Sequence, residues 1–163
     1  GIGSVNSAPS NGVLEFSLSG SASKGDYIWI ATEVPNFQAV FGFAPTFTDN
    51  VASINGDDSI ELFFNDSVID TFGDTSKDGT GEPWEYLDSW AYRVSGTSAN
   101  TSFNLTDWTI AGKSALDGLD AAQQGAAVPF GTYTMAAVPE PSTIAAILGL
   151  CGLAFVMIRR RRR

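Results

Sequence analysis

Apolar and polar positions alternate along several short segments of the chain, which is the two-residue period of a β-strand. The clearest case is 59–72, where two apolar segments flank the turn-forming residues Asn65 and Asp66. This pattern predicts a β-hairpin. The side chains that we expect to face the core are Ile60, Leu62, Phe64 and Val68.

Other segments also carry strand patterns. Segment 27–32 is apolar on both faces, so we expect a central strand there, and a short helix is expected at 36–41. The remaining predicted strands are 13–18, 90–94, 103–105 and 108–110. Segment 121–137 carries no such strand pattern and is predicted to be a linker. Short strands separated by turn residues favour an all-β fold, an immunoglobulin-like β-sandwich.

Composition narrows the function classes. The chain has 163 residues, enough for one domain of ordinary size, with 12% aromatic residues and 17 glycines. It has no histidine and a single cysteine, which excludes Ser-His triads, histidine or multi-thiolate zinc sites and an internal disulfide. Carboxylate pairs arise by chance among 18 acidic residues, so we expect no enzymatic activity.

Charge divides the chain into two parts. Five of the nine basic residues end the chain, and residues 1–138 carry 4 basic residues against 17 acidic ones, a net charge of 4 − 17 = −13. Such a body repels nucleic acid and attracts cations.

The C-terminal region has the composition of a membrane anchor. Residues 143–158 contain no charge, and as a helix these 16 residues would span roughly 24 Å. Five arginines follow this segment: Arg159, Arg160, Arg161, Arg162 and Arg163. Because positive residues stay on the cytoplasmic side, we expect a transmembrane helix at 143–158 with residues 1–138 outside the cytoplasm.

A proline-rich element precedes this segment. Its residues are Pro139, Glu140 and Pro141. The two prolines keep the backbone extended and present Glu140 in an accessible strand. Pro-Glu-Pro, a short apolar helix and an arginine cluster resemble the PEP-CTERM sorting signal of Gram-negative bacteria, here at 138–163.

That resemblance implies a route and partners. An exosortase would recognise the signal at the inner membrane and process the chain near Pro-Glu-Pro. The protein would then reach the cell surface or an extracellular matrix, with exopolysaccharide as a further partner. Residues 1–11 contain no signal peptide, so we expect that an export signal was removed or that the sequence is a fragment.

The middle of the chain resembles the lamin-tail-like domain of bacterial secreted proteins. The blocks FSLSGSASKGDYIWIAT, ASINGDDSIELFFNDSVIDTFGD and WEYLDSWAYR carry the resemblance, which covers residues 12–118. It implies an immunoglobulin-type sandwich over 1–120. The Ile-Thr-Glu and aromatic-Val-Glu-Leu blocks that usually open such domains do not precede Gly12, so we expect N-terminal truncation.

Segment 74–85, DTSKDGTGEPWE, follows the spacing of a calcium-binding loop. The expected ligands are Asp74, Ser76, Asp78 and Glu85. Lys77 and Pro83 argue against an EF-hand, which leaves a looser calcium loop on a β scaffold or a solvated acidic turn.

The aromatic residues Trp84, Tyr86, Trp90 and Tyr92 stand at alternate positions, which favours core packing on one strand face over sugar stacking. The sequence therefore indicates a non-catalytic surface or matrix protein. The alternatives are a calcium- or carbohydrate-binding module, or the accessory domain of a secreted nuclease or phosphatase.

Overall fold

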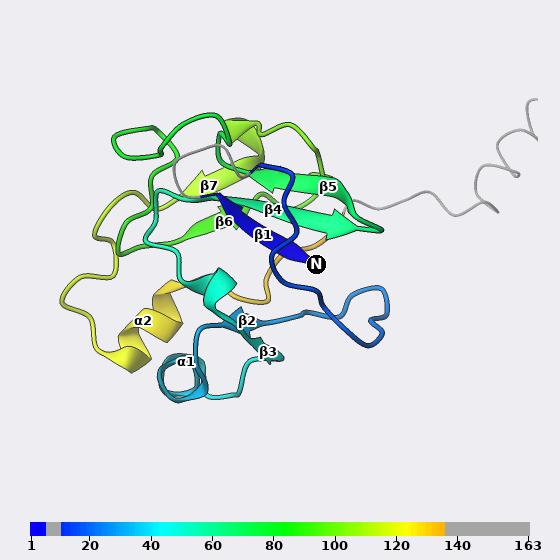
Figure 1. The fold of residues 1–163 in the computed structure, drawn as a ribbon. Coiled ribbons are helices and arrows are strands. Elements are labelled where there is room, and N and C mark those ends of the chain that lie inside the picture. Colours follow the sequence, from blue (N-terminus) through cyan, green and yellow to red (C-terminus); the bar gives the residue numbers. More distant parts are fainter. Residues whose placement is uncertain (6–10, 136–163) are drawn as a thin grey trace, which may run out of the picture.

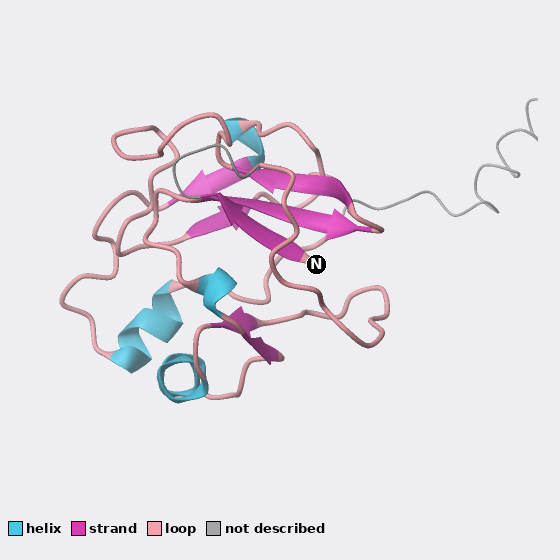
Figure 2. Ribbon diagram, in the orientation of Figure 1, coloured by secondary structure: helices cyan, strands magenta, loops and turns pink. Residues whose placement is uncertain are grey.

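The computed structural model describes residues 1–5 and 11–135, which form seven short strands and two α-helices joined by long turns (Figures 1 and 2). The strands are β1 (Ile2–Val5), β2 (Ile30–Ala31), β3 (Phe47–Thr48), β4 (Ser59–Phe64), β5 (Ser67–Phe72), β6 (Ala91–Arg93) and β7 (Trp108–Ile110). The helices are α1 (Val34–Phe41) and α2 (Ala121–Ala127), with 3-10 turns η1 (Asn50–Ala52) and η2 (Leu105–Asp107).

The strands form three small sheets. One is antiparallel with the order β1-β4-β5, the second is the antiparallel pair β6-β7, and the third is the parallel pair β2-β3. Figure 1 shows both antiparallel sheets in one half of the molecule and β2, β3 and the two α-helices in the other. The predicted β-rich fold is confirmed. The immunoglobulin-like, lamin-tail-like sandwich stays a prediction, because the largest sheet among the described residues has three strands.

The predicted hairpin is confirmed as β4 and β5. Its two-residue turn consists of Asn65 and Asp66, with φ angles of 48° and 59°. Asn and Asp tolerate this left-handed backbone, which matches the twist of the flanking strands. The register shifts between Leu62 and Phe63, so β5 contains a bulge.

The predicted core face of β4 is wrong in part. Phe63 is 4% exposed, whereas Leu62 is 38% and Phe64 66% exposed. The N-terminal segment covers the Phe63 face, because the Phe63 ring packs beside Gly3 and the Glu61 carboxylate accepts a hydrogen bond from the N–H of Gly12. Ile60 and Leu62 line a cavity on the other face.

Two predicted strands are short or missing. Segment 13–18 only borders β1, through a single bridge between Ile2 and Phe16. Segment 27–32 supplies only β2 and is not central, since Tyr27 is 44% exposed. The Trp29 ring stacks between Tyr27 and Phe130, with centroids 5.3 and 4.8 Å away. These rings therefore pack on one another and on the neighbouring loops. They do not lie in the interior of a large sheet.

Later segments follow the prediction more closely. The strands predicted at 90–94 and 108–110 are present as β6 and β7, and the helix expected at 36–41 is α1. The strand at 103–105 is absent, because the chain turns into η2 at Leu105. The side chain of Asn104 accepts the N–H of Thr106 and caps that turn.

The interpretation of 121–137 as a linker is wrong for its described part. Helix α2 begins with a capping box, in which Asp120 and Gln123 each accept the other's backbone N–H. A Cβ on Gly125 would lie 2.1 Å from the carbonyl oxygen of Val40, so the missing side chain lets α2 lie directly on α1. After α2, the Tyr133 hydroxyl donates a hydrogen bond to the Thr97 carbonyl. This bond attaches the segment that follows α2 to the loop after β6.

No helix in the part of the chain that the structure describes is long and apolar enough to cross a membrane. The predicted transmembrane helix 143–158 lies outside the described residues, and so do the predicted sorting residues Pro139, Glu140, Pro141 and 159–163.

Two adjacent phenylalanines test the observed face of β4. Phe63→Ala should lower the free energy of unfolding by about 3–5 kcal/mol, because it leaves a cavity beside Gly3. Phe64→Ala is the matched control and should cost about 0.5 kcal/mol or less, because that ring is exposed. Urea unfolding measures both values, and an equal loss in the two variants would contradict the face assignment.

Candidate functional site

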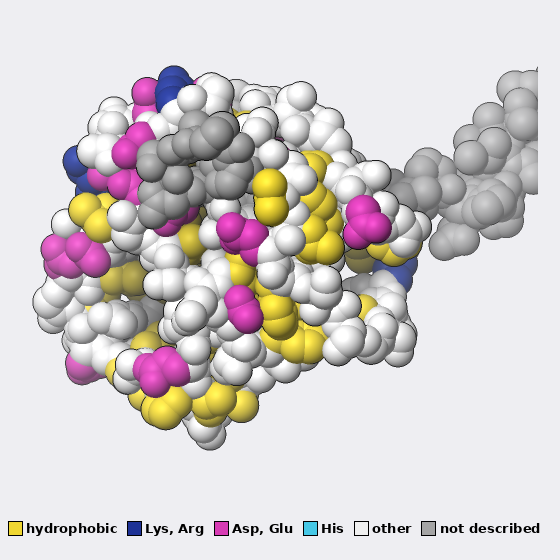
Figure 3. Space-filling model, in the orientation of Figure 1, with side chains coloured by type: hydrophobic (Ala, Val, Ile, Leu, Met, Phe, Trp, Pro, Cys, Tyr) yellow, Lys and Arg dark blue, Asp and Glu magenta, His cyan; other side chains and the backbone are white. Residues whose placement is uncertain are grey.

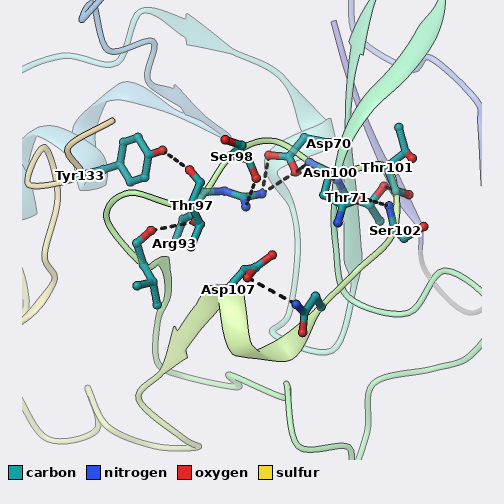
Figure 4. Close-up of polar contacts among 12 residues, drawn as sticks. Asp70, Thr71, Arg93, Thr97, Ser98, Asn100, Thr101, Ser102, Asp107 and Tyr133 are labelled. Atoms are coloured by element: carbon teal, nitrogen blue, oxygen red, sulfur yellow. Dashed lines mark hydrogen bonds and ion pairs between the residues drawn. The ribbon is translucent and has the colours of Figure 1, made fainter. Parts of the chain in front are cut away.

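A partly buried ion pair connects the two antiparallel sheets. The guanidinium of Arg93, on β6, binds both carboxylate oxygens of Asp70, on β5 (Figure 4). Their side chains are 13% and 17% exposed. The Arg93 Cζ also lies 4.2 Å from the centre of the Trp108 ring, so β7 holds the cation from a second side.

The same pair positions the loop after β6. Arg93 Nη1 donates to the Ser98 carbonyl at 3.1 Å, and the Asn100 N–H donates to Asp70 Oδ1 at 3.0 Å. The Thr71 N–H donates in turn to the Asn100 carbonyl at 2.9 Å. Figure 4 shows these partners around the two charges. Because both members of the pair bond to each other and to backbone groups of the same loop, the pair is a structural clamp.

Of the predicted calcium ligands, Asp74 and Ser76 contact each other, whereas Asp78 and Glu85 each have a separate local contact. Asp74 accepts the hydroxyl of Ser76 at 2.6 Å, and Asp78 accepts the N–H of Thr80 at 2.8 Å. Glu85 is buried, where it accepts the Gly81 N–H at 2.7 Å and lies 3.3 Å from Lys113 Nζ.

The hydrogen bonds from Ser76 hold the pKa of Asp74 below its usual value, and the Thr80 backbone does the same for Asp78. These contacts are those of self-capping turns. Within 1–5 and 11–135 no group of three or more Asp, Glu, His or Cys side chains is close enough together to hold a metal ion. The structure thus does not bring the four expected ligands together, and calcium binding stays a prediction from the sequence.

Acidic residues are spread over the surface. Figure 3 shows Asp and Glu side chains scattered across one face, with few lysines or arginines near them. Two of the acidic residues flank Lys77, whose Nζ lies 3.7 Å from Asp74 and 3.1 Å from Glu82. Both contacts are solvent-exposed, and exposed ion pairs stabilise proteins little.

The aromatic series 84–92 divides in two. Trp84 is buried and packs edge-on against Phe72, with ring centroids 5.9 Å apart, and Tyr86 meets the same ring at 5.3 Å. The core-packing interpretation is therefore confirmed for Trp84. A single strand through all four aromatic residues is wrong, since β6 contains only Tyr92 of them. The buried indole is not available for stacking on a sugar.

One buried carboxyl lies next to this aromatic core. Asp58 is 2% exposed; its Oδ2 accepts the Asn55 N–H at 3.0 Å, while Oδ1 has no partner in the described structure. Burial raises the pKa of Asp58, and the neighbouring acids Asp57 and Asp78 raise it further. Burial raises the pKa of Tyr86 as well.

The comparison with known families concerns the C-terminal segment. Residues 137–163 match the PEP-CTERM protein-sorting motif. The motif confirms the sorting signal predicted at 138–163. It indicates a protein that is exported and sorted through the membrane, with exosortase as the enzyme that recognises such signals. No curated protein and no solved structure matches the chain.

The Asp70–Arg93 pair was not predicted from the pattern of apolar residues. Asp70 interrupts an apolar strand, and Arg93 ends a strongly aromatic segment. A charged residue at an inward strand position needs a partner of opposite charge. Arg93 is one of only four basic residues in 1–138, so this reasoning leaves Asp70 few candidates.

Removal of one member of the pair tests the clamp. Arg93→Met should lower the free energy of unfolding by about 3–5 kcal/mol, because the Asp70 charge is left partly buried without its partner. Lys77→Met, which removes two exposed ion pairs, should cost about 1 kcal/mol or less. If the losses of Arg93→Met and Asp70→Asn simply add in the double variant, the two side chains are not coupled and the clamp is wrong.

The buried Asp58 should give a distinct pH dependence. Its pKa is raised in the folded state, so the folded state binds the proton more tightly than the unfolded state, and stability falls as pH rises from 3.8 through the folded pKa. Asp58→Asn should remove this fall and be more stable than wild type at neutral pH, but not well below pH 3.8. Asp66→Asn, in the exposed hairpin turn, is the control.

Urea unfolding across that pH range measures the difference between wild type and each variant. A difference for Asp58→Asn that does not change with pH would show that the pKa of Asp58 is the same in the folded and unfolded states.

Proposed function

We propose that this chain is a non-catalytic surface protein, whose folded body is displayed outside the cell after an exosortase removes its C-terminal segment. The match of 137–163 to the PEP-CTERM protein-sorting motif carries the proposal. The order of its parts supports processing, because Pro139 and Pro141 flank Glu140 just before the apolar segment, and prolines favour extended backbone.

The charge distribution also supports placing the body outside the cytoplasm. The five arginines at the end of the chain favour the cytoplasmic side, and the body with its net charge of −13 lies before the apolar segment. The acidic surface of the body would keep it soluble and unattached to nucleic acid once it is released. A final location in an exopolysaccharide matrix is part of the proposal.

The absence of enzymatic activity is also part of the proposal. The chain has no histidine, and the partly buried pair Asp70 with Arg93 bonds to structural partners. We assign the body a display or binding role for these reasons.

Intact-mass analysis of the protein from its native host tests the processing step. The mass of the surface form should correspond to the folded body with no residues beyond about Ser142. Glu140→Ala should leave the full C-terminus attached, because the variant alters the extended recognition element. Glu33→Ala, an exposed acidic residue of the body, is the matched control and should be processed like wild type.

Recovery of Arg163 in the surface form of the wild-type protein would contradict the proposal. Equal processing of Glu140→Ala and Glu33→Ala would show that Pro-Glu-Pro is not the recognised element.

A further inference from the structure

A cavity of about 400 Å³ lies between the antiparallel sheets and the segments around the two α-helices. Strands β4, β5, β6 and β7 all contribute to its wall, together with α1 and the residues after α2. Six of the lining residues are Phe41, Leu62, Phe72, Ala91, Trp108 and Phe130.

The size of the cavity limits what it can hold. A cavity of about 150 Å³ with apolar walls is large enough for benzene, and small-molecule sites begin at about 300 Å³. The observed volume of about 400 Å³ therefore suits a molecule of two fused or linked rings.

The wall of the cavity is almost entirely carbon. Aromatic rings from four different elements face it, and Ile60 and Leu62 of β4 supply aliphatic surface. Asp70 is the one charged residue in its wall, and its carboxylate is already bound by Arg93. The wall can therefore contact flat apolar groups, and its one charged residue is already paired.

The charge of the body selects against anions. Residues 1–138 carry a net charge of −13, so a negatively charged ligand would be repelled before it reached the cavity. A strongly polar ligand would lose hydration inside, where the only wall hydroxyls without a partner in the described structure are those of Tyr86 and Ser89.

We propose that this cavity binds a small, neutral, two-ring hydrophobic molecule. Binding would bury the apolar face that the hairpin presents through Ile60 and Leu62, and would fill the space between the two antiparallel sheets. The proposal goes beyond surface display, because it gives the displayed body a ligand class.

A matched pair of probes tests the site: 2-naphthol, which is neutral, and naphthalene-2-sulfonate, which has the same rings and a negative charge. The full chain in lipid nanodiscs, with labelled Ile, Leu and Val methyl groups, is titrated by NMR. The expected result is nuclear Overhauser contacts from 2-naphthol to methyl groups of Ile60, Leu62 and Val128. Val94, which does not line the cavity, should show none. The sulfonate should bind about tenfold more weakly or not at all.

Variants that fill the cavity provide the second arm. Ala91→Phe and Val128→Phe each place a ring in the cavity, and either should abolish the contacts while the other amide signals stay dispersed. Val94→Phe is the matched control and should bind 2-naphthol as wild type does.

The wild-type titration can overturn the proposal by itself, even if a filled variant fails to fold. Absence of contacts to the cavity methyl groups would overturn it, and so would equal contacts at Val94. Equal binding of the sulfonate would overturn the selection for a neutral ligand. Contacts from the cavity methyl groups to residues 143–158 that 2-naphthol does not displace would show that the chain itself fills the cavity.

Discussion

The ion pair between Asp70 and Arg93 is the contact on which the arrangement of the two antiparallel sheets depends. The body carries 17 acidic residues against four basic ones, so most of its charges repel one another. Arg93, on β6, reaches Asp70 on β5 and lies against the Trp108 ring of β7. The loop that contributes Ser98 and Asn100 closes around the same two charges.

Aromatic packing supplies the remaining cohesion. Phe72 lies at the centre of one group of rings, with Trp84, Tyr86, Phe103 and Trp108 around it at centroid distances between 4.7 and 5.9 Å. A second group joins Tyr27, Trp29, Phe37, Phe41, Phe43 and Phe130. The cavity lies between these groups, since Phe72 and Trp108 of the first and Phe41 and Phe130 of the second line it.

Local sequence signals predicted the local structure well. The Asn65-Asp66 turn identified the hairpin because those residues accept left-handed backbone, and the PEP-CTERM segment was recognised from the order of its parts. Alternation did not show which face of β4 is buried, because Phe63 and Phe64 are both apolar and the covering segment comes from the distant N-terminus.

Contacts between segments that are far apart in the sequence could not be predicted from the pattern of apolar and polar residues. Helix α2 was missed because its alanines and glutamines resemble a linker until Gly125 is seen against Val40. The spacing of 74–85 predicted one shared ion, whereas each carboxylate satisfies its own turn or a lysine. Spacing fixes which oxygens are available, but the β scaffold determines where they point.

Labelling of intact host cells tests most directly whether the sorting signal carries a folded body outside the cell. Ser19 is exposed, so Ser19→Cys should react with a membrane-impermeant maleimide on intact cells. Ser59 is fully buried, so Ser59→Cys should react only after unfolding. Labelling of Ser19→Cys only after cell lysis would contradict the account, because the body would then remain inside.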